Sequence, residues 1–241
     1  MATNHFCESY GSNHIIRTKA SNIELVSFYK GTNGLVLRVR DSGYYGMNAS
    51  FFNSGSTRYP AILNIAYQDG ENLGCDIDLP SGSVDGYENL TGTSLAYWNG
   101  STVGIAHNVL NGDNSIVPKR VGTWAQGGIG LYLGDSKWAS KFDGEGSVYS
   151  ITDTAYRTGL IVNRNTKDVY LFACPTRKVS VSAFRQAMMD YLEIKDGSSN
   201  GGFDAIMLDG GSSAQIYCDS LDEHPLTMRP IPQAITLKNK R

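Results

Sequence analysis

Long apolar runs and dense basic runs are both missing from this chain of 241 residues. No apolar stretch approaches the roughly 20 residues of a membrane-spanning helix, so we expect no membrane partner. The 21 Lys and Arg residues nearly balance the 23 Asp and Glu residues, which gives a net charge of −2. The chain therefore lacks the basic surface of a nucleic-acid binder, and we expect no nucleic-acid partner. Any anionic ligand must be held by a few local groups.

The amino terminus lacks the basic start and apolar middle of a secretory signal. We therefore expect a cytoplasmic or virion-associated protein of phage or bacterial type, or a secreted protein whose signal has been removed.

Cysteine and histidine are scarce, with four residues of each. The cysteines have neither the paired spacing of a zinc site nor the density of a disulfide scaffold, so we expect free or buried thiols. The histidines show no metal-binding spacing, and we predict no metal site and no cofactor. The four cysteines are Cys7, Cys75, Cys174 and Cys218.

Glycine and tyrosine are plentiful, at 27 and 14 residues, which favours a loop-rich and β-rich protein over a helical bundle. The length is sufficient for a substantial core without disulfides or metals. We expect one domain over residues 1–241.

The carboxyl-terminal half contains clear local patterns. Residues 159–163 and 169–174 predict a hairpin. Apolar residues at i, i+3, i+4, i+7 and i+8 from Phe184 predict a helix, with Ser180 or Ser182 as its N-cap. Residues 205–208 read as a buried strand. If the strands on either side of this helix are parallel, a right-handed crossover places Asp209 at a carboxyl end, where ligand sites commonly form.

The segment from Phe203 to Gln215 is the most informative, because its strand delivers Asp209 into Gly210, Gly211, Ser212 and Ser213. The glycines permit positive φ and close approach of a ligand, and the serines can cap a turn or bind an anion. Turn chemistry alone also explains these residue types.

The segment resembles the carboxyl-terminal signature of the phosphodiester glycosidase family, and three further segments match the family in order. They are Asn48-Ala-Ser-Phe-Phe52, Tyr156-Arg-Thr-Gly159 and Arg229-Pro-Ile-Pro-Gln-Ala-Ile235. The resemblance covers about residues 48–235. It implies an α+β fold of mixed β-sheets with packed helices in a single compact domain.

The resemblance also implies a site. Asp209 and Arg157 are the expected catalytic residues: the carboxylate activates water or stabilises positive charge on a sugar ring, and the guanidinium holds phosphate. The expected substrate-binding residues are Asn48, Phe52, Gly210, Gly211, Ser212, Ser213 and Arg229. Ala49 and Ser50 replace two family glycines, which changes how closely the backbone approaches a ligand. A structural Arg157 paired with a carboxylate remains an alternative.

The leading hypothesis is a hydrolase that cleaves a sugar 1-phosphodiester at the anomeric carbon, giving free sugar and a phosphomonoester. Its partner is a small-molecule or glycan phosphodiester. One alternative is a non-catalytic module that binds glycan phosphates or teichoic acid. Another is an enzyme or sponge acting on a nucleotide-linked sugar signal. The sequence does not predict the sugar or the oligomeric state.

Overall fold

A ten-stranded sheet forms the centre of the molecule in this computed structural model, which describes residues 5–28, 38–52, 62, 65–73, 93–109, 116, 118–145, 149–219 and 221–240. Its main path runs β1-β2-β11-β10-β12-β9-β5-β6, and β7 joins it through β9 and carries β8. The strands are β1 (His5–Tyr10), β2 (Asn13–Lys19), β5 (Ala66–Gln68), β6 (Glu71–Asn72), β7 (Thr93–Trp98), β8 (Val103–Val109), β9 (Trp124–Gly130), β10 (Thr154–Asn163), β11 (Asp168–Ser180) and β12 (Phe203–Met207).

A second sheet of five strands has the order β14-β13-β4-β15-β3. Its strands are β3 (Ile23–Ser27), β4 (Tyr44–Asn48), β13 (Ile216–Cys218), β14 (Leu221–Glu223) and β15 (Gln233–Lys240). Three short 3-10 helices connect strands, namely η1 (Ala20–Asn22), η2 (Val39–Ser42) and η3 (Gly211–Ser213).

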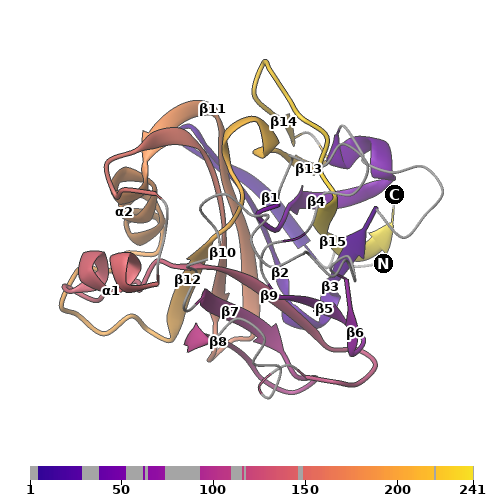
Figure 1. Ribbon diagram of the computed structural model, residues 1–241, viewed down its shortest axis with the longest axis horizontal. Coiled ribbons are helices and arrows are strands. Elements are labelled where there is room, and N and C mark those ends of the chain that lie inside the picture. The colour runs from indigo at the N-terminus through magenta and orange to yellow at the C-terminus, as the bar shows by residue number, and fades with distance from the viewer. Residues whose placement is uncertain are drawn as a thin grey trace, which may run out of the picture.

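The helices α1 (Trp138–Gly144) and α2 (Val181–Tyr191) lie on one side of the large sheet, and the second sheet lies on the other (Figure 1). Alternation along β10 explains this layering, since successive side chains of a strand point to opposite faces. Leu160 packs in the cluster that contains Met47 and Ile235 of the second sheet. Ile161 packs in the cluster that contains Phe184 and Met188 of α2, among others. One central sheet therefore carries a core on each face.

The predicted fold class is only partly confirmed, because the structure is mostly β, with two α-helices in the described part of the chain. The expected mixed sheets are wrong: every strand pair described is antiparallel. The local elements were predicted correctly, and Ser180 accepts the capping hydrogen bond from the amide of Ala183. β11 and β12 run in the same direction, but β10 lies between them and pairs antiparallel with both. No described helix is long and apolar enough to cross a membrane.

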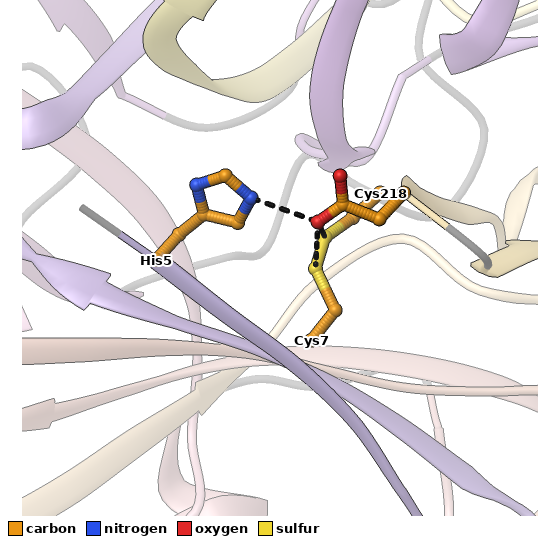
Figure 2. Close-up of a disulfide and its surroundings, with 4 residues drawn as sticks. His5, Cys7 and Cys218 are labelled. Carbon is orange, nitrogen blue, oxygen red and sulfur yellow. Dashed lines mark hydrogen bonds and ion pairs between the residues drawn. A yellow bond between two sulfur atoms is a disulfide. The ribbon is translucent and has the colours of Figure 1, made fainter. Parts of the chain in front are cut away.

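The expectation for the cysteines is wrong for one pair. Cys7 and Cys218 form a disulfide across a sequence separation of 211, with their Cα atoms 6.4 Å apart (Figure 2). The bond links β1 of the large sheet to β13 of the second sheet. Cys174 is a buried free thiol, as predicted, and Cys75 lies outside the described residues.

Candidate active site

Asp209 lies at the junction of the two sheets. β12 ends at Met207, and the next two amides bond to different neighbours: Leu208 N–H donates to the carbonyl of Thr158 at 2.9 Å, and Asp209 N–H donates to the carbonyl of Ala49 at 3.1 Å. The carbonyl of Asp209 accepts from the Asn48 amide and the Thr158 hydroxyl, each at 2.6 Å. The main chain is therefore held on both sides just where the carboxylate projects.

Two glycines shape the loop after Asp209. A Cβ atom at Gly210 would lie 2.4 Å from the carbonyl oxygen of Tyr156, a distance that real Cβ atoms do not adopt. Gly211 has φ +57°, in the left-handed region that side chains disfavour, and begins the 3-10 turn η3. The Asp-Gly-Gly sequence is thus required by close backbone approach and by turn geometry.

The Asp209 carboxylate is buried, with 4% of the residue exposed, and is paired with a cation. Arg229 donates from Nη2 to Asp209 Oδ2 at 2.7 Å and from Nε to the Ser213 hydroxyl at 2.5 Å. Burial raises the pKa of Asp209 above its ordinary value, although Arg229, Ser213 and the Gly210 amide oppose the rise by favouring the ionised form.

Arg157 is the opposite case, a buried cation without a carboxylate partner among the residues that the structure describes. The residue is 3% exposed and lies on β10. Its guanidinium donates to the carbonyl of Asp153 at 2.5 Å and to that of Val179 at 3.4 Å, and it makes no ion pair with any described acidic residue. Burial lowers the pKa of Arg157. A buried unpaired charge is costly, and a bound anion would compensate it.

Arg157 and Asp209 line one small cavity of about 220 Å³. The carboxylate, two guanidinium groups and the glycine loop meet two aromatic rings there, those of Phe51 and Tyr149, whose centroids are 5.8 Å apart. The described lining residues are Phe51, Tyr149, Ala155, Arg157, Asp209, Gly210, Gly211, Ser212 and Arg229. Asp209 is the one carboxylate among them, so this donor set does not fit a divalent metal.

Three of the expected substrate-binding residues do not line the cavity. Phe52 does not line the cavity: its ring stacks 4.4 Å from Arg229 Cζ, and its neighbour Phe51 takes the expected place. Both amide hydrogens of Asn48 are used, by Asp209 and by Thr158, so Asn48 positions the loop. Ser213 is fully buried and holds Arg229.

The expected site residues did not include Phe51, Tyr149 or Thr158, although Phe51 and Thr158 lie in the matched segments. Tyr149 matches no motif, and only the fold brings it to the cavity. Alternation along the Phe51-Phe52 pair predicts that the two rings face opposite sides but does not indicate which side is the cavity.

A larger cavity, of about 540 Å³, lies between β1, β2 and the start of β11. Its cations are already paired, since Arg17 bonds Asp168 at 2.8 Å and Lys19 bonds it at 2.6 Å. Its charges are thus satisfied within the protein, in contrast to that of Arg157.

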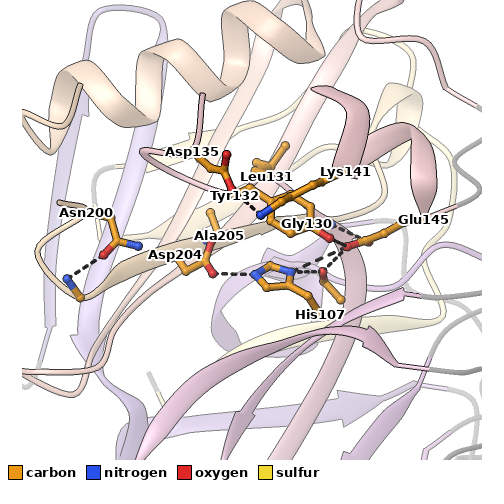
Figure 3. A network of polar contacts seen from close by, with 12 residues as sticks. His107, Gly130, Leu131, Tyr132, Asp135, Lys141, Glu145, Asn200, Asp204 and Ala205 are labelled. Carbon is orange, nitrogen blue, oxygen red and sulfur yellow. Dashed lines mark hydrogen bonds and ion pairs between the residues drawn. The ribbon is translucent and has the colours of Figure 1, made fainter. Parts of the chain in front are cut away.

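A buried polar network lies near the start of β12 (Figure 3). His107 Nε2 lies 2.7 Å from Asp204 Oδ2, and His107 Nδ1 lies 2.5 Å from the Ser94 hydroxyl. That hydroxyl donates to Glu145, which is fully buried and also accepts from Tyr132. Burial lowers the pKa of His107, but the bonds to Asp204 and Glu145 outweigh burial and raise it to about 9. The network holds a charged imidazole against two carboxylates within the protein.

No protein-family model matches the chain, and no curated protein matches its sequence. Solved structures do match. The catalytic domain of zebrafish N-acetylglucosamine-1-phosphodiester alpha-N-acetylglucosaminidase, auto-inhibited by its pro-peptide, aligns with a TM-score of 0.60 and 11% identity over 98% of this chain and 82% of that one. The chain therefore has a fold similar to that of the zebrafish catalytic domain. The resemblance expected from the sequence motifs is therefore confirmed at the level of fold.

A hypothetical protein from Synechocystis also matches, with a TM-score of 0.51 and 19% identity. The alignment covers 96% of this chain and 61% of that protein, so the chain spans less than two thirds of its length. At these identities the likeness concerns the fold, and function must be argued from the site.

Proposed function

We propose that this protein hydrolyses a sugar 1-phosphodiester at the anomeric carbon and releases the free sugar and a phosphomonoester. The observation that carries the proposal is the buried Arg157 guanidinium, which has no described carboxylate partner and lines the same cavity as Asp209. The zebrafish enzyme of the same fold is named for a sugar 1-phosphodiester reaction, which supports this substrate class.

Arg157 binds the phosphodiester in this proposal. A guanidinium offers a planar fork that matches two phosphate oxygens, and the bonds are strong in a site from which water is excluded. Gly211 and Ser212 line the same cavity, and their backbone amides add two donors. Phosphate binding would supply the missing counter-charge for Arg157.

Asp209 acts on the sugar side. Water attacks the anomeric carbon, the bond from that carbon to the phosphate oxygen breaks, and the phosphomonoester leaves with the bonding pair. The proton lost by the water passes to the Asp209 carboxylate and then to solvent. A phosphomonoester is stable as an anion, so the leaving group needs no strong general acid and one carboxylate suffices. Arg229 favours the ionised form of Asp209 and orients its carboxylate.

Phe51 and Tyr149 form an apolar wall beside these charged groups. Aromatic faces pack against the apolar faces of sugar rings, and we assign this wall to the sugar. The cavity of about 220 Å³ is below the volume of typical drug-sized pockets, about 300–1,000 Å³. We therefore expect it to hold the sugar or the phosphate, with the rest of the substrate outside.

The test is incubation with a panel of sugar 1-phosphodiesters and nucleotide sugars, followed by phosphorus NMR. We expect a phosphomonoester signal from at least one sugar 1-phosphodiester. Asp209→Asn, which removes the charge with little change in shape, is expected to abolish turnover while keeping the thermal unfolding transition. Arg157→Lys keeps the charge but loses the fork, and is expected to raise KM.

Arg17→Lys provides a matched control, because Arg17 lines the larger cavity and is already paired with Asp168. Its kinetics should equal those of the wild type. Binding without product would favour a glycan-phosphate binding module, and preference for nucleotide sugars would favour the nucleotide-linked alternative. Turnover that persists in Asp209→Asn would remove Asp209 from the mechanism.

A further inference from the structure

One cluster outside the candidate active site combines side chains that bind metals. His5, Cys7, Cys218 and Asp219 each offer one ligand atom, and these four atoms lie within 4.8 Å of one another (Figure 2). His5 and Cys7 are alternate residues of β1 and so share one face of that strand. Cys218 ends β13, and Asp219 follows it in a turn with φ +45°.

The distances agree with tetrahedral coordination. Zinc binds sulfur at about 2.3 Å and nitrogen or oxygen at about 2.0 Å, so neighbouring ligand atoms of a tetrahedral site lie roughly 3.3–3.8 Å apart. Asp219 Oδ2 lies 3.1 Å from His5 Nε2, 3.4 Å from Cys7 Sγ and 3.6 Å from Cys218 Sγ. The Asp219 carboxylate oxygen therefore already lies close to the distances of a tetrahedral zinc site from the imidazole and from each sulfur atom.

The pair of sulfur atoms must separate before both can bind a metal. The Cα atoms of Cys7 and Cys218 are 6.4 Å apart, near the upper end of the usual disulfide range of about 4.4–6.8 Å. The backbone thus leaves room for the two sulfur atoms to move apart by side-chain rotation after reduction.

Access and chemistry also fit zinc. The His5 side chain is 8% exposed, whereas that of Asp219 is 56% exposed, so an ion can enter from the Asp219 side. Two thiolates, one imidazole and one carboxylate are ligands that zinc accepts, and the thiolates disfavour calcium and magnesium.

We propose that His5, Cys7, Cys218 and Asp219 form a zinc site that opens when the Cys7–Cys218 disulfide is reduced. With a phosphine as reductant, the disulfide takes up two electrons and two protons, and the phosphine takes the oxygen of a water molecule to become a phosphine oxide. Zn²⁺ then displaces the two thiol protons and binds both thiolates. Either state, disulfide or zinc, ties β1 to β13.

The site lies close in sequence to the proposed active site, since β13 begins three residues after η3. Its test nevertheless needs no substrate, so failure of one proposal is distinguishable from failure of the other.

The experiment uses the full chain reduced with a phosphine, freed of the reductant without oxygen, and titrated with Co²⁺ as a spectroscopic probe and with Zn²⁺. We expect one equivalent of Co²⁺ to give the intense thiolate-to-cobalt absorption of a tetrahedral site, and Zn²⁺ to displace it. The oxidised protein should give no such band. Zn²⁺ should raise the melting temperature of the reduced protein only.

Variants test the ligands. Cys7→Ser with Cys218→Ser should lose the thiolate band, and Cys174→Ser, which removes the buried free thiol, should keep it. His5→Gln and Asp219→Asn retain both thiols, so they remain informative if the double cysteine variant fails to fold. Each should weaken Co²⁺ affinity by about tenfold or more.

Several results would overturn the proposal. They are a reduced wild type without a thiolate band, a band that survives in the double cysteine variant, and equal affinity in His5→Gln.

Discussion

Replacement of Arg157 by methionine separates a ligand-binding arginine from a structural one. Methionine has nearly the length of the arginine stem but carries no charge. If Arg157 is present to bind phosphate, the empty protein gains little from its charge, and the variant should fold about as well as the wild type. If Arg157 is structural, the variant should be clearly less stable.

The magnitude follows from the contacts of Arg157. Replacing a buried ion pair by apolar side chains ranges from neutral to about 1–4 kcal/mol stabilising, and removal of the single buried charge of Arg157 is expected to fall in the same range. Against this, the carbonyl of Asp153, bonded at 2.5 Å, loses its donor, which costs about 1–3 kcal/mol if it stays unpaired. The two effects oppose each other, so we expect the free energy of unfolding of Arg157→Met to lie within about 2 kcal/mol of the wild-type value.

Phosphate should then distinguish the two proteins. At a phosphate concentration ten times Kd, the wild type gains about 1.4 kcal/mol of stability. Loss of charge-assisted hydrogen bonds worth about 1.5–3 kcal/mol raises Kd roughly 10- to 150-fold. At the same concentration the variant should gain less than about 0.5 kcal/mol.

The assay is urea unfolding with and without inorganic phosphate, at constant ionic strength set with chloride. Arg17→Met, at the larger cavity, is the control and should keep the full phosphate effect. The reasoning is refuted if phosphate stabilises Arg157→Met as much as the wild type. It is equally refuted if Arg157→Met alone loses more than about 4 kcal/mol, the range of a broken structural ion pair.

Two further predictions concern pH. In the proposed mechanism Asp209 must be ionised to accept a proton, and burial raises its pKa, so the acidic limb of the pH profile of kcat should lie above the ordinary carboxyl pKa of about 3.9. Arg229→Gln should move this acidic limb to higher pH. An acidic limb that does not move would contradict the pairing of Arg229 with Asp209. The pKa of His107 is raised to about 9. The stability that protonated His107 gains from Asp204 and Glu145 is therefore fully present below pH 6.5 and is lost as the pH rises through 9. Unfolding measurements should show a loss on the order of 3 kcal/mol over this window, and His107→Gln should remove the slope; an unchanged slope would exclude His107 as its source.

The local elements were predictable because local patterns encode them. The spacing of Phe184, Met188 and Tyr191 marks one face of a helix, and Ser180 can cap it without help from distant residues. Strand pairing is different, because β10 separates β11 from β12 and nothing in the helix between them specifies that insertion. The expected mixed sheets came from the family resemblance, and local patterns could not correct them because they do not specify which strands pair.

The disulfide was not predictable for the same reason, since it also depends on nonlocal contacts. Cys7 and Cys218 carry no shared motif, and their pairing depends on how the edge strand of one sheet meets the second sheet. Their separation of 211 residues leaves no local signal. Motif order was more informative for the cavity, because the matched segments supply Arg157, Asp209 and Arg229, all of which line it.

Some polar groups at the cavity bond within the protein and others are left for a ligand, and this difference indicates which groups determine substrate specificity. Asn48 and Thr158 donate to the carbonyl of Asp209, and the Ser213 hydroxyl accepts from Arg229, so these polar groups hold the protein and not a ligand. Among the described lining residues, the remaining groups are the Asp209 carboxylate, the guanidinium groups of Arg157 and Arg229, loop amides and aromatic rings. A guanidinium and amides recognise any phosphodiester. In the proposed reaction, discrimination between sugars therefore comes mainly from the shape of the aromatic wall. Substitutions there should change substrate preference, while substitutions of Arg157 should weaken all substrates alike.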